Sequence, residues 1–322
     1  MLIETKKLEK SFLGKKVLEN ICIEIKKGEV FGVIGSSGAG KSTLLRCLST
    51  LEQDFEGEVL FEGRAFSFTD KKKLRQERRR LGMIFQHFHL LQSRTVEENI
   101  RLPLELEGKE GDIEKVLGQV GLRGKGKFPI TRLSGGEKQR VAIARALIMQ
   151  PEVLFCDEVT SSLDPKSTEE ILCLLQELNQ KLGLTLVLIT HEMDVVRKIC
   201  HKVAVMSHGK IIEMGSTVEI FSNPKETLTK ELVQKSSHED LAALKEKEPN
   251  ALFLALHFKG ERTGSPLISW MIKELDLEVN IVAGWMDRIE GVLVGSLTVA
   301  ITGDTSSVFA FLQRHDMTYE VL

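Results

Sequence analysis

The sequence predicts an α/β domain at residues 1–222 and a smaller α+β domain at 251–322. Through the first part of the chain, short apolar runs typical of buried strands alternate with helical segments, as in a parallel sheet covered by helices. A polar, charged stretch at 223–250 then predicts a linker, and beyond it the order of elements changes. With 322 residues, of which 42% are hydrophobic, the chain is long enough for two domains that each bury a core.

The overall composition excludes several classes of protein. A formal net charge of −2 argues against a nucleic-acid-binding protein that relies on basicity. The five cysteines are scattered and form no Cys-x-x-Cys pair, which indicates reduced thiols in a cytosolic setting and no zinc site. No apolar run approaches the roughly 18–20 residues that span a bilayer, and the N-terminus has no signal-peptide pattern. If the protein acts at a membrane, we expect a peripheral subunit held by a partner.

A glycine-rich loop between a strand and a helix is the most informative feature of the first domain. The apolar run 30–34 predicts the strand, and the apolar spacing of 44–48 predicts the helix. Between them lie Gly35, Ser36, Ser37, Gly38, Ala39, Gly40, Lys41, Ser42 and Thr43. Backbone N–H groups of such a loop bind phosphate, and a glycine-rich turn with an incidental lysine is the weaker alternative. We expect Lys41 to reach the β- and γ-phosphates of a nucleoside triphosphate and Ser42 to ligate Mg²⁺.

Short strands and one basic segment surround this loop. Strands are predicted within residues 2–5, 17–25 and 57–63. Phe12, near the first turn, is either a core or rim aromatic or a residue that stacks on an adenine ring. The segment 71–80 is a basic helical run, for which a solvated helix face is favoured over a membrane-proximal position.

Gln86 ends the next apolar strand, at 81–86, where an amide can reach a magnesium ion or an attacking water. His87 and His89 alternate along an extended chain and so point to opposite faces, which argues against a metal site there. The same loop carries apolar residues of a kind that often meets a partner: Phe88, Leu90 and Leu91.

A helical subdomain at 95–130 and a second anion site are predicted next. Ser134 and Glu137 have the S-x-x-E spacing of a capping box, so a long helix begins here. The capping box does not account for two consecutive glycines, Gly135 and Gly136, at the start of this helix. They leave bare N–H groups at the positive end of the helix dipole, and we expect an anion to approach them.

Acidic and imidazole side chains follow two further buried strands. Asp157 and Glu158 come after the apolar run 153–156, and His191 follows the run 184–190. In open α/β sheets, ligands bind at the carboxyl ends of the strands. We expect Asp157 in the Mg²⁺ shell, Glu158 on the attacking water and His191 on the γ-phosphate. A helix N-cap role for the acidic pair and a surface position for the histidine are the alternatives.

The second domain has its own order of elements. A turn at 161–165, a helix at 168–182 and a hairpin at 203–214 complete the first domain. Beyond the linker, strands are predicted at 252–258, 277–286, 292–302 and 317–322, and helices at 266–275 and 306–314. The order β-α-β-β-α-β is the split-βαβ, ferredoxin-like arrangement. Because it contains no catalytic constellation, we expect a binding or regulatory module.

Taken together, these motifs resemble the ATP-binding cassette (ABC) ATPases over roughly residues 1–230. The motifs that carry the resemblance are Gly35–Ser42, Gln86, Leu133–Arg140, Asp157-Glu158, Ser161–Asp164 and His191. The string Leu-Ser-Gly-Gly-Glu-Lys-Gln-Arg at 133–140 is that family's signature and is more specific than the phosphate loop. The strings 84–88 and 190–196 and the C-terminal module are similar to the ATP-binding subunits of bacterial methionine importers.

This resemblance implies a homodimer that binds two ATP molecules between its subunits. The loop 35–43 of one copy would face three residues of the other: Ser134, Gly135 and Gly136. Asp164 would lie at the dimer seam, Phe12 would stack on adenine, and Gln86 would sense Mg²⁺ and the partner. The sequence departs from the family at Phe12, where tyrosine is commoner, at Val159, where a small residue or proline is frequent, and at Ser162, where alanine is usual. None of these departures removes a catalytic group, so an active ATPase is expected, with Glu158, His191 and Gln86 as catalytic residues.

The resemblance also implies partners and regulation. The ATPase would lie on the cytoplasmic face of the cell membrane, where Gln86–Asn99 would receive a helix of an integral-membrane permease. An extracytoplasmic substrate-binding protein would act indirectly. Methionine would bind the C-terminal domain and inhibit transport, with Asn280 and Ile281 as candidate contacts, although Asn280 as a strand-end or turn residue is the alternative.

Two other functions are alternatives to methionine import. The same importer ATPase could serve another amino acid or small solute, because subunits other than this one choose the cargo. ABC ATPases that act on nucleic acid carry long insertions between the phosphate loop and the signature. Here only a short helical subdomain intervenes, so no nucleic-acid partner is expected.

Overall fold

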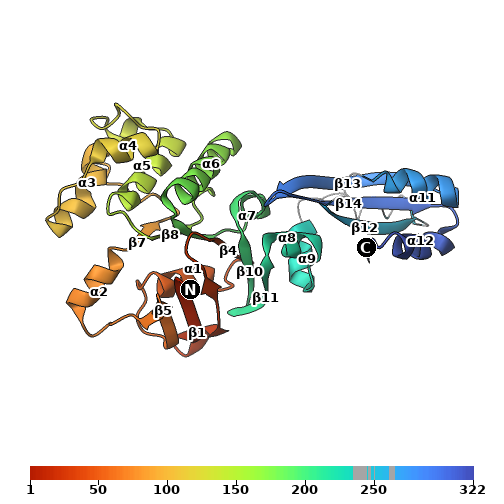
Figure 1. Ribbon diagram of the computed structural model, residues 1–322, viewed down its shortest axis with the longest axis horizontal. Coiled ribbons are helices and arrows are strands. Elements are labelled where there is room, and N and C mark those ends of the chain that lie inside the picture. The colour runs from red at the N-terminus through yellow and green to blue at the C-terminus, as the bar shows by residue number, and fades with distance from the viewer. Residues whose placement is uncertain (235–244, 246–247, 250, 261–264) are drawn as a thin grey trace. The chain divides into compact units, whose positions relative to one another are not determined.

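Two compact units make up the chain, residues 1–214 and 215–322. The structure is a computed structural model that describes residues 1–234, 245, 248–249, 251–260 and 265–322 (Figure 1). Each unit has its own sheet system and its own hydrophobic core. Among the described residues, no helix has both the length and the apolar character that crossing a membrane requires.

The larger sheet of the first unit has six strands in the order β11-β10-β4-β9-β8-β7. The strands are β4 (Val30–Gly35), β7 (Leu81–Ile84), β8 (Val153–Asp157), β9 (Thr185–Ile189), β10 (Lys202–Ser207) and β11 (Lys210–Ser216). From β7 to β10, neighbouring strands pair in parallel. Every residue of β4 and β9 is buried, as expected for a parallel sheet covered on both faces. The carboxyl ends of β4, β7, β8 and β9 therefore meet at one edge of this sheet.

A smaller antiparallel sheet packs on one side of this core. It contains β1 (Ile3–Phe12), β2 (Lys15–Ile21), β3 (Glu24–Ile25), β5 (Glu56–Phe61) and β6 (Arg64–Ala65). Its inward residues, such as Leu8 and Ile21, share one core with Phe31 of β4, Phe155 of β8 and the apolar face of α1 (Lys41–Leu48). The strand that precedes the phosphate loop and the helix that follows it are thus fixed by the same core.

Helices form the rest of the first unit. They are α2 (Lys71–Arg78), α3 (Val96–Glu107), α4 (Ile113–Gln119), the 3₁₀ helix η1 (Ile130–Arg132), α5 (Gly135–Leu147), α6 (Pro165–Leu182) and α7 (Met193–Ile199). In Figure 1, α3, α4 and α5 gather as a separate group beside α6, which confirms the predicted helical subdomain. Thr95 and Glu98 form a capping box at the start of α3.

The second unit contains the predicted ferredoxin-like sheet, in the order β13-β14-β12-β15. Its elements are β12 (Leu252–Lys259), α11 (Leu267–Leu275), β13 (Glu278–Ile289), β14 (Val292–Thr302), η3 (Thr305–Ser307), α12 (Val308–Arg314) and β15 (Thr318–Val321). All three strand pairs are antiparallel. Leu254 and Leu256 pack with Phe311 of α12 and Met271 of α11 in the core on one face of the sheet.

Two short helices that precede the sheet belong to this second unit: α8 (Thr217–Ser222) and α9 (Thr227–Gln234). Phe221 of α8 makes an edge contact with Trp285 of β13, with ring centroids 5.8 Å apart. The contacts therefore divide the chain after Met214, whereas the predicted end of the first domain is residue 222. Of the predicted linker 223–250, residues 235–244, 246–247 and 250 lie outside the described residues.

Helix α2 has the solvated face predicted for the basic segment 71–80, because Leu74 is its one buried residue. Its arginines bind specific partners: Arg75 and Arg79 both pair with Glu107 at the end of α3. Arg78 donates to the Thr50 hydroxyl at 2.9 Å. Arg75 stays exposed in its ion pair, whereas Arg78 and Arg79 are partly buried. The segment joins the helical subdomain to the sheets.

Candidate nucleotide site

The phosphate loop lies between β4 and α1, and at two of its glycines both the backbone angle and the lack of space exclude a side chain. Gly35 has φ 151°, and a Cβ there would lie 2.1 Å from the Met206 carbonyl oxygen. Gly40 has φ 101°, and its Cβ would lie 2.8 Å from the Val17 carbonyl oxygen. Gly40 also occupies the N-cap of α1 and offers no side-chain cap, so the first N–H groups of this helix are left for another acceptor.

Lys41 is the buried cation of this loop. Its Nζ donates to the carbonyl oxygens of Gly35 at 2.8 Å and Ser36 at 3.0 Å. Burial lowers the pKa of this ammonium, while the nearby carboxylates of Glu158 and Asp157 act in the opposite direction. A cation held only by carbonyl dipoles can exchange them for phosphate oxygens, which carry full charge.

Ser42 and Asp157 bring two oxygen donors together beside the loop. The Ser42 hydroxyl donates to Asp157 Oδ1 at 3.3 Å. Desolvation raises the pKa of Asp157, the Ser42 hydrogen bond lowers it, and the charge of Glu158 raises it further. An under-compensated carboxylate next to a hydroxyl fits a hard cation such as Mg²⁺. The described residues contain no group of three or more histidine, cysteine or acidic side chains that could hold a metal, so phosphate and water would supply the other ligands.

Glu158, Gln86 and His191 form one hydrogen-bonded group at the carboxyl ends of three strands. Gln86 Nε2 donates to Glu158 Oε2 at 2.9 Å, and His191 Nδ1 lies 3.1 Å from Glu158 Oε1. Glu158 has φ 46°, a left-handed conformation that a side chain of this kind rarely adopts. Strain of this type gathers at functional sites, where the surroundings enforce it. Of the three predicted catalytic residues, Gln86 and His191 therefore each contact Glu158.

Two hydroxyl residues surround this group: Ser161, which begins the family motif Ser161–Asp164 but had no predicted role, and Thr160, which was not predicted. Ser161 donates to the Glu158 carbonyl oxygen at 3.0 Å and its hydroxyl accepts from Gln86 at 3.3 Å. Thr160 is buried and donates to Glu192 Oε1 at 3.1 Å, which joins the loops after β8 and β9. For Thr160, the signal in the sequence is its position just after the Asp-Glu pair.

The loop between Gln86 and α3 is a tight turn, not an extended chain. Phe88 and His89 have φ 57° and 47°. The alternation argument for His87 and His89 is therefore wrong in its geometry. The described residues still bring no third metal-ligating side chain to them.

The signature residues lie at the starts of α5 and α6. Ser134 and Glu137 form the predicted capping box of α5. Asp164 caps α6 by accepting from the Ser167 amide at 3.0 Å and from its hydroxyl at 2.6 Å. A Cβ at Gly136 would lie 3.1 Å from the Ser167 hydroxyl, so close packing also contributes to the need for glycine there. Within residues 1–214, the signature and the loop 35–43 are not joined by a hydrogen bond or an ion pair.

Phe12 ends β1 with 44% of its surface exposed. On one face of its ring lies Lys10 Nζ, 4.7 Å from the centroid. Lys10 is itself fixed by Glu52 and Asp54, at 3.1 and 3.2 Å. The ring is thus held by a cation contact and remains accessible to a planar ligand.

The candidate effector residues belong to the second unit. Asn280 and Ile281 lie near the start of β13, the outer strand of its sheet, and both are exposed. Asn280 pairs in register with Ala300 of β14, so it lies within a strand and not at a turn.

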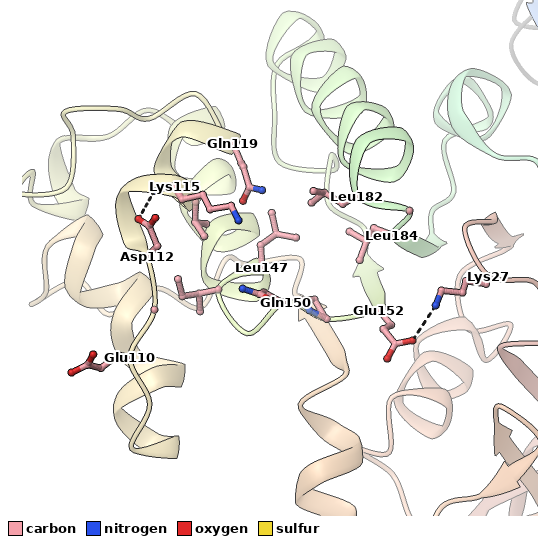
Figure 2. Close-up of a pocket in the computed structure, with 15 residues that line it drawn as sticks. Lys27, Glu110, Asp112, Lys115, Gln119, Leu147, Gln150, Glu152, Leu182 and Leu184 are labelled. Carbon is pink, nitrogen blue, oxygen red and sulfur yellow. Dashed lines mark hydrogen bonds and ion pairs between the residues drawn. The ribbon is translucent and has the colours of Figure 1, made fainter.

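A cavity of about 510 Å³ lies away from all these residues (Figure 2). It borders the amino ends of β8 and β9, the opposite sheet edge from Asp157 and His191. Leu147, Leu182 and Leu184 lie close together in Figure 2, and Lys27 pairs with Glu152 at 3.7 Å. This cavity is therefore separate from the candidate nucleotide site.

Known proteins match the two units separately and the chain as a whole. Residues 18–161 match the ABC transporter family, and residues 253–321 match the NIL domain. The methionine import ATP-binding protein MetN of Protochlamydia amoebophila is 43% identical over all of this chain and 98% of its own length. The MetN 2 protein of Bacillus licheniformis is 46% identical over 95% of this chain and 93% of that protein.

Two solved structures cover the larger unit. The dimeric ATP-binding cassette MJ0796 in a post-hydrolysis state, bound to ADP and Pi, has a TM-score of 0.61 and 32% identity over 67% of this chain and 99% of that one. The cbiO1 protein from Clostridium perfringens, part of the ABC transporter complex cbiONQ, has a TM-score of 0.65 and 29% identity over 77% of this chain and 98% of that one.

Proposed function

Because this chain belongs to the methionine import ATP-binding proteins of the ABC transporter family, we propose that it hydrolyses ATP to drive methionine uptake. The observation that carries the proposal is the joint placement of Lys41, Ser42, Asp157 and Glu158 at one sheet edge. This edge provides an anion site, a cation site and a candidate base within one group of contacts.

The side chains of this edge divide the reaction between them. Lys41 would leave its loop carbonyls for the phosphate oxygens, and Ser42 with Asp157 would hold Mg²⁺. When bound, Mg²⁺ neutralises charge on the phosphates. Glu158, which Gln86 and His191 hold in place, would accept a proton from the attacking water. Gln86 would therefore position the carboxylate of Glu158, and a contact between Gln86 and Mg²⁺ stays a prediction.

We also propose that two copies close around ATP. Support comes from the signature helix start: the Glu137 carboxylate accepts from the Ser134 N–H, but the N–H groups of Gly135 and Gly136 bind no acceptor within residues 1–214. A γ-phosphate bound between two copies would stabilise the closed dimer, and hydrolysis would release it. Size-exclusion chromatography of the hydrolysis-impaired Glu158→Gln chain tests this. ATP should shift it from monomer to dimer, and a further Gly135→Trp change should prevent the shift.

The permease contact is proposed for the turn after Gln86 and the groove beside it. This groove of about 530 Å³ is lined mainly by apolar side chains, among them Phe85, Leu102, Pro103 and Met149. Its size and apolar lining suit a short helix of an integral-membrane subunit, which would hold this chain at the cytoplasmic membrane face. Cysteine pairs between Leu102 and that helix should cross-link in the assembled importer. Absence of cross-linking at every helix position would contradict the assignment.

Methionine is the proposed effector of the second unit. Exposed Asn280 and Ile281 on an outer strand offer an amide and an apolar side chain, which match the polar and apolar halves of an amino acid. Calorimetry of the full chain with a panel of amino acids tests this. Asn280→Ala should abolish methionine binding, and Arg288→Gln, on the same strand, should not. A coupling of roughly 1–3 kcal/mol between effector and ATPase sites would be typical. Unchanged binding by Asn280→Ala would place the effector elsewhere.

A further inference from the structure

Arg145 lies in the last turn of α5 and binds the turn that follows Gln86. Its Nη1 donates to the His89 carbonyl oxygen at 2.6 Å, and its Nη2 donates to the Phe88 carbonyl oxygen at 2.8 Å. A single guanidinium therefore holds two consecutive carbonyl groups of a segment 56 residues away in the sequence.

The turn that Arg145 holds is strained. Phe88 and His89 are both non-glycine residues with positive φ. Such a backbone persists only where surrounding contacts enforce it. Local contacts contribute: the rings of Phe85 and His89 lie 4.9 Å apart, and the Leu91 amide donates to the side chain of Asn99 at 2.8 Å. The carbonyl groups, however, are held from α5 by Arg145.

Arg145 differs from the arginines of the nearby basic segment. Arg75 and Arg79 pair with a carboxylate, whereas no carboxylate forms an ion pair with Arg145 among the described residues. Desolvation lowers the pKa of its half-buried guanidinium. Partial desolvation of a cation that has no counter-charge destabilises the folded state more than an ion pair at the surface does. The planar fork of arginine, unlike the single ammonium of lysine, matches two neighbouring acceptors.

We propose that Arg145 is a positioning residue that couples the permease-facing turn to the signature helix. This inference rests on the proposed function. Helix α5 starts at the signature, Ser134–Gly136, and carries Arg145 in its last turn, so the arginine links the turn to the helix that would face the other nucleotide. The same turn begins at Gln86, which touches Glu158. One displacement of the turn would then reach both a chain's own site and the site across the dimer.

Amide hydrogen exchange of the full chain tests the link without any partner. Four amides of the turn donate hydrogen bonds, those of Phe88, His89, Leu91 and Arg94. In Arg145→Lys they should exchange at least tenfold faster than in the wild type, while amides of α5 and β8 keep their rates. The control Arg101→Lys, which alters an exposed i,i+4 pair on α3, should change neither. Unchanged exchange in the turn, or faster exchange throughout the unit, would overturn the inference.

The assembled importer tests the coupling itself. With permease and binding protein in liposomes, we compare ATP turnover in the complex with that of the isolated chain. Arg145→Lys should reduce this stimulation ratio at least fivefold, and Arg101→Lys should leave it unchanged. A purely structural role would lower both rates together and keep the ratio, which would refute the proposal. If the permease does not stimulate even the wild type, the proposed importer function is contradicted. The hydrogen-exchange experiment still tests whether Arg145 holds the turn.

Discussion

Replacing Glu158 by glutamine removes the candidate base and keeps its shape. The carboxylate now accepts from Gln86 on one oxygen and lies beside His191 on the other. A glutamine amide can keep one of these contacts with its oxygen, while its NH₂ group must face the other neighbour. The left-handed backbone at 158 is unaffected by the change, so the loop should keep its conformation.

The expected loss is set by the chemistry that disappears. A positioned general base contributes roughly 10²–10⁴ in rate, which corresponds to about 2.7–5.4 kcal/mol of transition-state stabilisation. In the proposed site, nucleotide would be bound by Lys41, Ser42 and the loop amides, none of which changes. We therefore expect an ATP dissociation constant within about threefold of the wild type, and a turnover reduced by at least roughly a hundredfold.

Phosphate release measured at saturating ATP, together with calorimetric ATP binding, checks this. Glu177→Gln is a matched control, because that glutamate forms an exposed ion pair with Lys181 on α6. Turnover of Glu158→Gln within a factor of three of the wild type would refute the assignment of the base. Loss of ATP binding along with turnover would show that Glu158 supports the loop and does not act on water.

Three further predictions concern single residues of the same unit. Asp157→Asn should abolish Mg²⁺-dependent turnover and raise the melting temperature of the nucleotide-free chain at neutral pH, because burial raises the pKa of Asp157 and so the ionised carboxylate destabilises the folded state. This gain in melting temperature should vanish as pH falls through the raised pKa, where Asp157 is protonated and uncharged. Gly35→Ala should destabilise the chain in urea by about 1–3 kcal/mol more than Gly38→Ala, because only the first Cβ meets the Met206 carbonyl oxygen; equal midpoints would contradict this. Phe12→Ala should weaken ATP binding in calorimetry by roughly 1–3 kcal/mol, as for other base-stacking aromatics, and Phe12→Tyr should not; equal affinities for all three chains would remove Phe12 from the site.

Local sequence patterns were sufficient for the elements and for most of the candidate site. The strand before Gly35, the capping box at Ser134 and the ferredoxin-like order after residue 251 each follow from spacing within a few residues. Asp157, Glu158 and His191 could be placed at one edge because all parallel strands end on the same side. These are short-range or topological constraints, which a single sequence carries in its periodicity.

The tertiary structure decided which of these groups touch. Gln86 and Glu158 are 72 residues apart, and only the strand order β9-β8-β7 brings the amide to the carboxylate. The sequence did not reveal that Arg75 and Arg79 both pair with Glu107, because Glu107 lies on a helix that no local pattern pairs with theirs.

The turn at Phe88 and His89 shows the same limit. Its left-handed backbone lacks glycine, so nothing in the local sequence marks it, and it is held by Arg145 from the far end of α5. Residue type and spacing determined which chemistry this chain can perform. Long-range packing decided how its groups are aimed, because a strained backbone or an unpaired cation is tolerated only where distant contacts compensate for it.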